Sequence, residues 1–527
     1  MYATVVPLAA LTFLVHYFFL RPLYHYFRDP KGLRKYHSVN WLAGITNIGF
    51  MYEAFKGRRS KRLAELHKVH PVIRIGPNSL SFRSLQAIKD IYGHGTPCTK
   101  DYFYSALSGT HFHLADVIDK QDHARKRKNL AAAYAIKNLE TWEHKVADKV
   151  ERFIRACDAA CTSPLDTNNS TPESEDLIFD YFNYANFFTE DAIVDIGLSE
   201  KLGFLDQGSD ECVAERMDGT QFRASYRKSL HNMATAQSRI VWAYEWFNFN
   251  KVLTGLVSRD FARRWEHNRN WDGILYHRAK KRLARYQAGE KLDDFFQVIM
   301  EDKGGRPHDL PWGEIVAEIS IMMNAGSDTT AIAMTNAMYL LHKNHRALDT
   351  LREELDGVLD PDEVVAPYDK VKHLPYLRAA IDETMRMMPP VSFNLPRRTP
   401  AGGMMVASEH IAGDTSVSIS AEVAHRDPEV FADPDSFAPE RWLGDKGREL
   451  QAGFVAFSAG SRGCIGRNIT YLEQTVLLAS VLHRYEMALP SPDWEPEQYE
   501  GTTTYMKELP LKVWRRNLGS SAANLLD

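Results

Sequence analysis

One cysteine lies in a glycine-punctuated segment, Phe457-Ser-Ala-Gly-Ser-Arg-Gly-Cys-Ile-Gly466. Gly460 permits a tight turn, so backbone N–H groups can approach the Cys464 sulfur and stabilise a thiolate, the form that ligates metals. Arg462 adds positive charge, and the apolar pattern after Gly466 predicts a helix whose N-terminus points at the cysteine. A single thiolate suits a planar cofactor such as haem. A buried free cysteine in an ordinary turn is the alternative interpretation.

A second group of residues could move protons. Ala325 and Gly326 are small, so a flat ring could approach the backbone there, and Asp328 and Thr329 supply a carboxyl and a hydroxyl group. An acid and an alcohol with ordered water can relay the protons that cleavage of dioxygen requires. The alternative is a helix kink in which threonine hydroxyls bond to backbone carbonyls.

The elements that must position these residues are mostly helical. Unbroken apolar periodicity predicts one long buried helix over residues 312–343. Alternating residues predict a short hairpin of strands at 72–76 and 79–82. Further helical patterns cover residues 122–160, 177–198, 219–247 and 256–288.

Four stretches together resemble the cytochrome P450 (haem-thiolate monooxygenase) superfamily. They are residues 457–466 (Phe-x-x-Gly-x-Arg-x-Cys-x-Gly), 325–330 (Ala-Gly-Ser-Asp-Thr-Thr), 383–386 (Glu-x-x-Arg) and 437–442 (Phe-Ala-Pro-Glu-Arg-Trp). The resemblance extends from about residue 40 to 515. It implies a mainly α fold with small β-sheets, a triangular helical prism around a buried haem b, with the Cys464 thiolate as axial ligand.

The resemblance also implies roles for individual residues. It makes Asp328 and Thr329 the proton relay, with Ala325 and Gly326 beside them in the oxygen-activation motif. Glu383, Arg386 and Arg441 would form a buried structural triad, although residues 383 and 386 share a helical face and an exposed ion pair is the simpler interpretation. The residues expected to bind the cofactor are His123, Arg127, Arg397, Phe457, Gly460, Arg462 and Gly466.

Other positions are expected to contact partners or substrate. The neighbouring bases Arg125, Lys126 and Lys128 are interpreted as a docking patch for an acidic electron donor, with a solvated face as the alternative. Residues 91–95 (Ile-Tyr-Gly-His-Gly), 100–104 (Lys-Asp-Tyr-Phe-Tyr), 125–128 (Arg-Lys-Arg-Lys) and 182–184 (Phe-Asn-Tyr) resemble membrane-bound fungal enzymes of the benzoate para-hydroxylase and pisatin demethylase type. An aromatic, methionine-lined pocket would suit an aromatic or polyketide-like substrate. The residues expected to line its pocket are Phe103, Tyr104, Phe112, Met322, Met323, Val391, Phe393, Thr503 and Tyr505.

Composition is consistent with one large catalytic domain. The 527 residues contain no internal repeat, and a formal charge of −4 favours neither nucleic acid nor another polyion as partner. Five scattered cysteines indicate reduced thiols rather than a disulfide framework. We expect a transmembrane anchor at 1–21, a basic and aromatic linker at 22–40, the catalytic domain at 41–515 and a tail at 516–527. A cleaved signal peptide is the alternative at the N-terminus.

The function expected from the resemblance is oxygenation of a small organic substrate in fungal secondary metabolism or aromatic catabolism. Electrons would come from NADPH through a separate flavoprotein reductase, with a b-type cytochrome as a further donor. The enzyme would be a monomer held by a single span in the endoplasmic reticulum membrane, with its catalytic domain in the cytosol. Oxidative phenol coupling is the main alternative, followed by a non-oxygenating haem-thiolate isomerase or a haem sensor.

Overall fold

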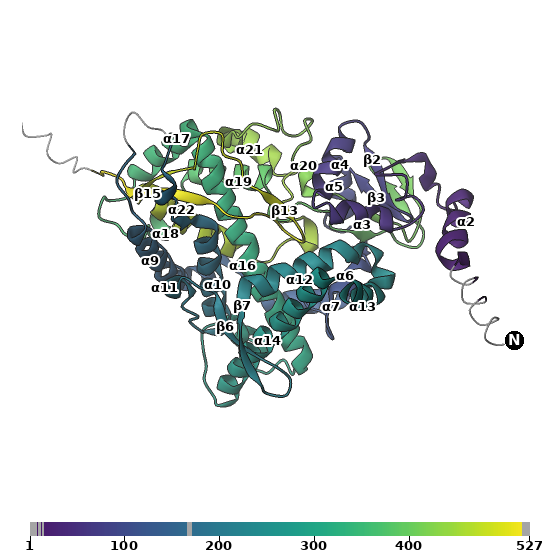
Figure 1. Cartoon of the computed structure of the whole chain (residues 1–527), viewed down its shortest axis with the longest axis horizontal. Helices are drawn as coiled ribbons and strands as arrows, with labels where there is room; N and C mark the ends of the chain where they lie inside the picture. The colour runs from purple at the N-terminus through teal and green to yellow at the C-terminus, as the bar shows by residue number, and fades with distance from the viewer. Residues whose placement is uncertain (1–7, 9–11, 13–14, 166–170, 519–527) are drawn as a thin grey trace, which may run out of the picture.

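The computed structural model describes residues 8, 12, 15–165 and 171–518. Most of them are helical, and Figure 1 shows α16 running through the middle of a roughly triangular molecule. The helices are α2 (Arg21–Arg28), α3 (Ile48–Phe55), α4 (Arg59–His67), α5 (Leu85–Tyr92), α6 (Phe103–Leu107), α7 (Lys120–Ala131), α8 (Ile136–Thr141), α9 (Glu143–Ala159), α10 (Tyr181–Leu198), α11 (Phe204–Gln207), α12 (Tyr226–Ile240), α13 (Phe247–Val257), α14 (Arg259–Gln287), α15 (Phe295–Met300), α16 (Trp312–Lys343), α17 (His345–Asp356), α18 (Tyr368–Val371), α19 (Pro375–Met387), α20 (Ala421–Ala424), α21 (Gly444–Leu450) and α22 (Arg467–Arg484).

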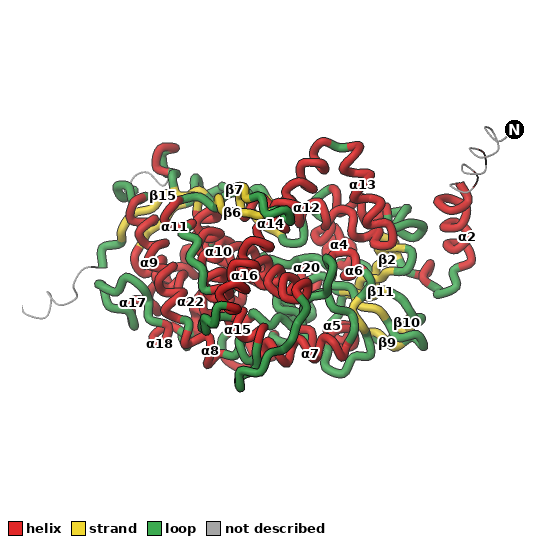
Figure 2. The backbone as a smooth tube through the Cα atoms, turned by 90° about the horizontal axis from the view of Figure 1, so that it is seen from below, coloured by secondary structure: helices red, strands yellow, loops and turns green. Residues whose placement is uncertain are grey.

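The strands form small sheets at the edges of the helical body. The largest has the order β1-β2-β3-β11-β8-β4, and in both views it lies near α2, at the end opposite β15 (Figures 1 and 2). The strands are β1 (His37–Ser38), β2 (Val72–Gly76), β3 (Ser79–Phe82), β4 (Thr99–Lys100), β5 (Phe179–Asp180), β6 (Glu211–Glu215), β7 (Gln221–Ser225), β8 (Arg397–Arg398), β9 (Met404–Val406), β10 (Glu409–Ile411), β11 (Ser416–Ser418), β12 (Tyr485–Ala488), β13 (Gln498–Glu500), β14 (Thr504–Met506) and β15 (Pro510–Arg515).

The local predictions with the strongest periodicity are confirmed. The long helix spans Trp312–Lys343, and the antiparallel pair β2–β3 occupies the residues expected of the hairpin. The helix predicted over 122–160 is wrong in detail, because the chain leaves helical geometry between α7 and α8, and α9 begins only at Glu143. The helix predicted from 219 is wrong at its start, since β6 and β7 form a hairpin whose turn contains Asp218 and Gly219.

Two glycines explain how closely α10 and α16 cross. A Cβ atom on Gly326 would lie 2.4 Å from Ile193 of α10, and one on Gly197 of α10 would lie 2.3 Å from the Met322 side chain. Side chains larger than hydrogen would therefore force the two helices apart. The crossing fixes α16 against the core and determines which of its faces remains free.

The predicted anchor, residues 1–21, lies largely outside the described residues. Within the described part of the chain, no helix is long and apolar enough to cross a membrane. The predicted linker is not only a linker, because β1 within it pairs with β2.

Candidate functional site

The Cys464 loop is built by close backbone packing. Gly460 has a φ of 65°, and a Cβ atom there would lie 2.0 Å from the Tyr92 carbonyl oxygen, so only glycine fits. The Cys464 N–H donates to the Phe457 carbonyl at 2.8 Å, which closes the loop. The predicted helix follows as α22, and Gly466 is its N-cap.

Cys464 is exposed as a residue, yet its thiol is closely surrounded by protein. This enclosure raises the pKa of the thiol, whereas the N–H groups of Gly466 and Arg467 and the charge of Arg127 act to lower it. A bound cation would tip this balance, because coordination deprotonates a thiol. The loop therefore has the donors that a metal thiolate needs.

Helix α16 borders the same site. The Thr330 and Thr470 hydroxyl groups lie 3.1 Å apart and join α16 to α22. Ala325 is exposed and Thr329 half-buried on a stretch of α16 that is otherwise largely buried. Ala325 on α16 and Cys464 in the loop before α22 are thus both exposed, and Gly326, predicted to admit a flat ring, instead faces Ile193.

The two predicted relay residues do not contact each other. The Thr329 hydroxyl donates to the Ala325 carbonyl at 2.9 Å. Asp328 is buried, and its carboxylate accepts from the Thr503 hydroxyl at 2.6 Å and lies 2.5 Å from His231 Nε2. The structure therefore supplies Asp328 with two partners from distant parts of the chain, and their roles are considered below.

Five basic side chains gather on one side of the Cys464 loop. Arg127 donates to the Gly463 carbonyl at 2.8 Å, and Arg462 donates to the carbonyls of Val117 and Ile118 at 2.5 and 3.0 Å. The positive charges of four of these bases lie close enough to the fifth, His123, to lower the pKa of its imidazole. The five residues, called the basic cluster below, are Lys100, His123, Arg127, Arg397 and Arg462.

The basic cluster is short of negative charge. Among the described residues, none of its members forms an ion pair with a carboxylate. Burial and the neighbouring positive charges lower the pKa of His123 to about 4 and that of Arg462 to about 10. Positive charges held together in a partly buried site call for an anionic partner, and the two carboxylates of a haem fit this requirement.

Lys100 and His231 were missed in the sequence. Lys100 is buried, lies 3.8 Å from the centre of the Tyr104 ring, and has a pKa well below its ordinary value because of burial and the charges of Arg397 and Arg462. In the sequence Lys100 only opens the stretch Lys-Asp-Tyr-Phe-Tyr that resembles the fungal enzymes, and the fold alone places it beside Arg397 and Arg462. His231 is 97 residues from Asp328, and nothing local signals their contact.

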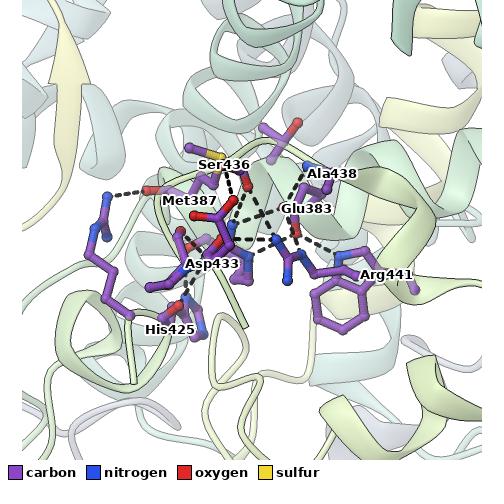
Figure 3. Close-up of polar contacts among 12 residues, drawn as sticks. Glu383, Met387, His425, Asp433, Ser436, Ala438 and Arg441 are labelled. Atoms are coloured by element: carbon purple, nitrogen blue, oxygen red, sulfur yellow. Dashed lines mark hydrogen bonds and ion pairs between the residues drawn. The ribbon is translucent and has the colours of Figure 1, made fainter. Parts of the chain in front are cut away.

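Glu383 and Arg441 lie side by side in Figure 3, and Arg386 pairs with the same carboxylate. Arg386 donates twice to the fully buried Glu383 carboxylate, both at 2.8 Å, and Arg441 donates to it at 3.0 Å. Trp442 Nε1 and the Ala438 N–H also donate to this carboxylate, each at 2.9 Å. Every oxygen lone pair of the buried anion thus has a partner, which is what makes a buried charge tolerable.

His425 lies near the triad (Figure 3) and also contacts the segment that leads into the cysteine loop. Its Nδ1 lies 3.0 Å from the Arg386 carbonyl, and its Nε2 accepts from the Val455 N–H at 2.9 Å. Nδ1 must therefore carry the proton, and the ring is neutral. Because Val455 lies two residues before Phe457, where the cysteine segment begins, the triad helps to hold the Cys464 loop in place.

The expected pocket residues separate into several environments. The Phe103 and Trp242 rings pack at a tilt of 44°, with 4.9 Å between centroids, and line a small cavity with Phe50, Tyr244 and Asp101. Phe393 packs near both rings, Tyr104 is buried beside the basic cluster, and Val391 is half-buried.

The other expected pocket residues lie elsewhere. Met322 fills the α10–α16 crossing, Met323 is fully buried, and Phe112 is exposed on a surface loop. Thr503 contacts Asp328, and Tyr505 stacks on His231.

The predicted docking patch is smaller than expected. Lys126 is buried and pairs with Glu314 at 2.6 Å and with Glu318 at 3.0 Å. Arg125 also pairs with Glu314. These ion pairs connect α7 to the first part of α16. Of the three bases, only Lys128 is exposed and without an ion-pair partner among the described residues.

Comparison with known proteins agrees with this geometry. The family model described as "Cytochrome P450" matches residues 51–514. The chain is 29% identical over 492 residues to benzoate 4-monooxygenase bphA of Aspergillus niger, covering 91% of this chain and 92% of that protein. It is 28% identical to cytochrome P450 monooxygenase astJ of Aspergillus oryzae (86% of each chain) and to cytochrome P450 monooxygenase cicH of Emericella nidulans (86% of this chain, 88% of that protein).

Proposed function

Because the chain belongs to the cytochrome P450 family and is a monooxygenase, we propose that it inserts one oxygen atom of dioxygen into a small aromatic or polyketide-like substrate. The observation that carries this proposal is the Cys464 loop beside a basic cluster whose members pair with no carboxylate among the described residues. Membership of the family implies haem with thiolate ligation, and the residues present fit that group.

Different residues of the chain would bind the cofactor and transfer protons. Cys464 would hold the iron, and the basic cluster would hold the propionates. Haem, when bound, supplies the reductive activation and cleavage of dioxygen. Asp328 and Thr329 would hold and pass protons beside Ala325, the exposed position of α16.

The proposed substrate class rests on aromatic side chains and on relatives. Phe103, Trp242 and Phe393 offer flat apolar faces near the basic cluster, a setting suited to a planar ring. Benzoate 4-monooxygenase is among the similar proteins. We therefore place this enzyme in fungal secondary metabolism or aromatic catabolism.

We also propose that electrons come from NADPH through a separate flavoprotein reductase. The exposed bases Lys128 and Arg467 lie on the helices that flank Cys464 and would attract an acidic donor. The enzyme would act as a monomer at the endoplasmic reticulum membrane, with its catalytic domain in the cytosol.

The membrane proposal draws on exposed apolar residues of α13. Phe249, Val252, Leu256 and Val257 are all exposed, a larger apolar group than scattered surface residues would give. Trp246, just before α13, lies 5.4 Å from Phe18 of the N-terminal segment. The apolar segment at 4–20 and α13 would then face the same lipid surface.

The test is oxidation by membranes that contain the full chain and a fungal reductase, supplied with NADPH, ¹⁸O₂ and a panel of aromatic acids and phenols. We expect NADPH-dependent formation of a product that carries one ¹⁸O atom. Dimeric products without ¹⁸O would show phenol coupling instead. Haem-loaded enzyme that oxidises no member of the panel would overturn the proposed substrate class.

A further inference from the structure

The Asp328 carboxylate joins three elements. It comes from α16, His231 comes from α12, and Thr503 lies in the turn between β13 and β14. Both carboxylate oxygens are engaged, one by each partner, and the group is buried. Asp328 can therefore turn towards Thr329 only when one of these two contacts opens.

The surroundings favour a stable His231–Asp328 contact. The Tyr505 ring packs against the His231 ring with 4.5 Å between centroids, and Phe182 of α10 lies beside both rings, 6.4 Å from His231 and 6.1 Å from Tyr505. Aromatic contacts on the ring fix the direction in which its Nε2 points. The side chain of His231 remains 13% exposed, so water can reach the ring.

Some charged groups around the pair attract the Asp328 carboxylate and others repel it. Arg227, one turn before His231 on α12, attracts the Asp328 carboxylate, whereas the buried Glu190 of α10 opposes a second negative charge nearby. Next to His231, the positive charges of Arg239 and Arg264 act to lower the pKa of Tyr505, although burial raises it overall. Burial alone raises the pKa of Asp328, but the charge and hydrogen bond of His231, together with Thr503 and Arg227, outweigh burial and place the pKa below its ordinary value.

We propose that His231 is a positioning residue for oxygenation: it orients Asp328 and resupplies that carboxyl group with protons. Asp328 rests as the carboxylate. The step moves one proton from the His231 imidazolium Nε2 to Asp328 Oδ1, and Asp328 passes that proton on towards Thr329 and returns to the carboxylate. The neutral imidazole then takes a proton from a hydronium ion at its exposed edge, which leaves water. Since His231 belongs to α12, this proton supply depends on α12 being seated on α16. The inference rests on the proposed function.

Two substitutions of His231 distinguish a role in orienting Asp328 from a role in proton transfer. His231→Gln keeps a donor near the Nε2 position but cannot titrate, and His231→Phe removes the donor while keeping a flat ring. We expect His231→Phe to lower kcat about tenfold or more with little change in KM, because general acid–base groups contribute effects of this size. His231→Gln should recover much of the coupling between NADPH consumption and product, but flatten the acid limb of the pH profile.

A spectroscopic measurement tests the contact without turnover. Infrared difference spectra of the holoenzyme against its Asp328→Asn variant identify the protonated carboxyl band of Asp328 as pH is varied. We expect this band to appear at higher pH in His231→Phe than in the wild type, because the substitution removes the positive partner that lowers the pKa of Asp328.

His277→Gln is the matched control. His277 lies 3.0 Å from Glu215, with burial close to that of the His231–Asp328 pair, but on α14 away from Asp328. It should alter neither kcat, the pH profile nor the Asp328 band. The proposal is overturned if His231→Phe matches the wild type in coupling, pH profile and infrared titration. A wild type without oxygenase activity would instead contradict the proposed function, and the infrared titration would still decide the His231–Asp328 link.

Discussion

Single residues at this site are understood through their partners. Cys464 is distinguished from the other cysteines by the N–H groups of Gly466 and Arg467 and by Arg127. Asp328 is distinguished from other buried acids by His231 and Thr503. In each case the motif identifies the residue, whereas the fold supplies the groups that set its protonation.

His425 gives a prediction at this scale. Burial and the Arg386 charge lower its pKa from 6.5 to about 3, so the native state binds fewer protons than the unfolded state below pH 6.5. The contribution of His425 to the free energy of unfolding is therefore complete above pH 6.5. It falls by about 1.4 kcal/mol per pH unit as the pH is lowered towards 3. His425→Phe should have a lower stability at pH 7 but a shallower decline between pH 6 and 4, measured from denaturation midpoints. Exposed His410→Phe should keep the wild-type slope, and an unchanged slope in His425→Phe would contradict the account.

The Glu383–Arg386 pair gives a second prediction. Glu383→Gln leaves the fully buried Arg386 without its carboxylate, and breaking a buried pair costs about 3–5 kcal/mol. We expect little haem-loaded protein, measured as haem per chain. Asp445→Asn breaks an exposed Asp–Arg pair with the same spacing and should leave haem content unchanged. Wild-type haem content in Glu383→Gln would show that the triad is dispensable.

At the scale of elements, the α10–α16 crossing decides what α16 presents to the site. Gly326→Ala would place a Cβ atom 2.4 Å from Ile193 and should cost about 1–3 kcal/mol. The double variant Gly326→Ala/Ile193→Ala should recover part of this loss, because the obstructing side chain is removed. Gly357→Ala, where the nearest atom lies at 3.4 Å, is the control for thermal unfolding. Equal stability of Gly326→Ala and wild type would contradict the tight crossing.

Elements with local signals were predictable and those set by distant contacts were not. The helix Trp312–Lys343 and the β2–β3 hairpin follow from periodicity within each segment. The Asp218-Gly219 turn was a local signal for the β6–β7 hairpin that the helical interpretation overlooked.

The same division holds within the site. Cys464 and the Glu383–Arg386 pair were recognisable from spacing, because each lies within one short segment. The contact of Asp328 with His231 and the place of Lys100 beside Arg397 depend on how separate elements pack. The separation of the Asp328 carboxyl from Thr329 also depends on these tertiary partners.

At the scale of the whole molecule, α2 and α13, which both carry exposed apolar side chains, lie on the same side of the molecule (Figure 1). Leu256→Glu/Val257→Glu would place charges on this surface and should reduce binding of the full chain to lipid vesicles several-fold, because burying a charge in lipid is costly. Met217→Glu, an equally exposed apolar position on the β6–β7 turn, should not. Haem content should be normal in both, and unchanged vesicle binding of the double variant would contradict the membrane proposal.

The central claim is that the Cys464 thiolate holds the haem, and one spectrum tests it most directly. The purified protein, reduced under carbon monoxide, should show the long-wavelength absorption band of thiolate-ligated haem. Cys464→Ala should lose this band, while Cys161→Ala, a half-buried cysteine of another region, should keep it. A wild-type band at the shorter wavelength of histidine ligation, or a long-wavelength band that survives in Cys464→Ala, would contradict the account.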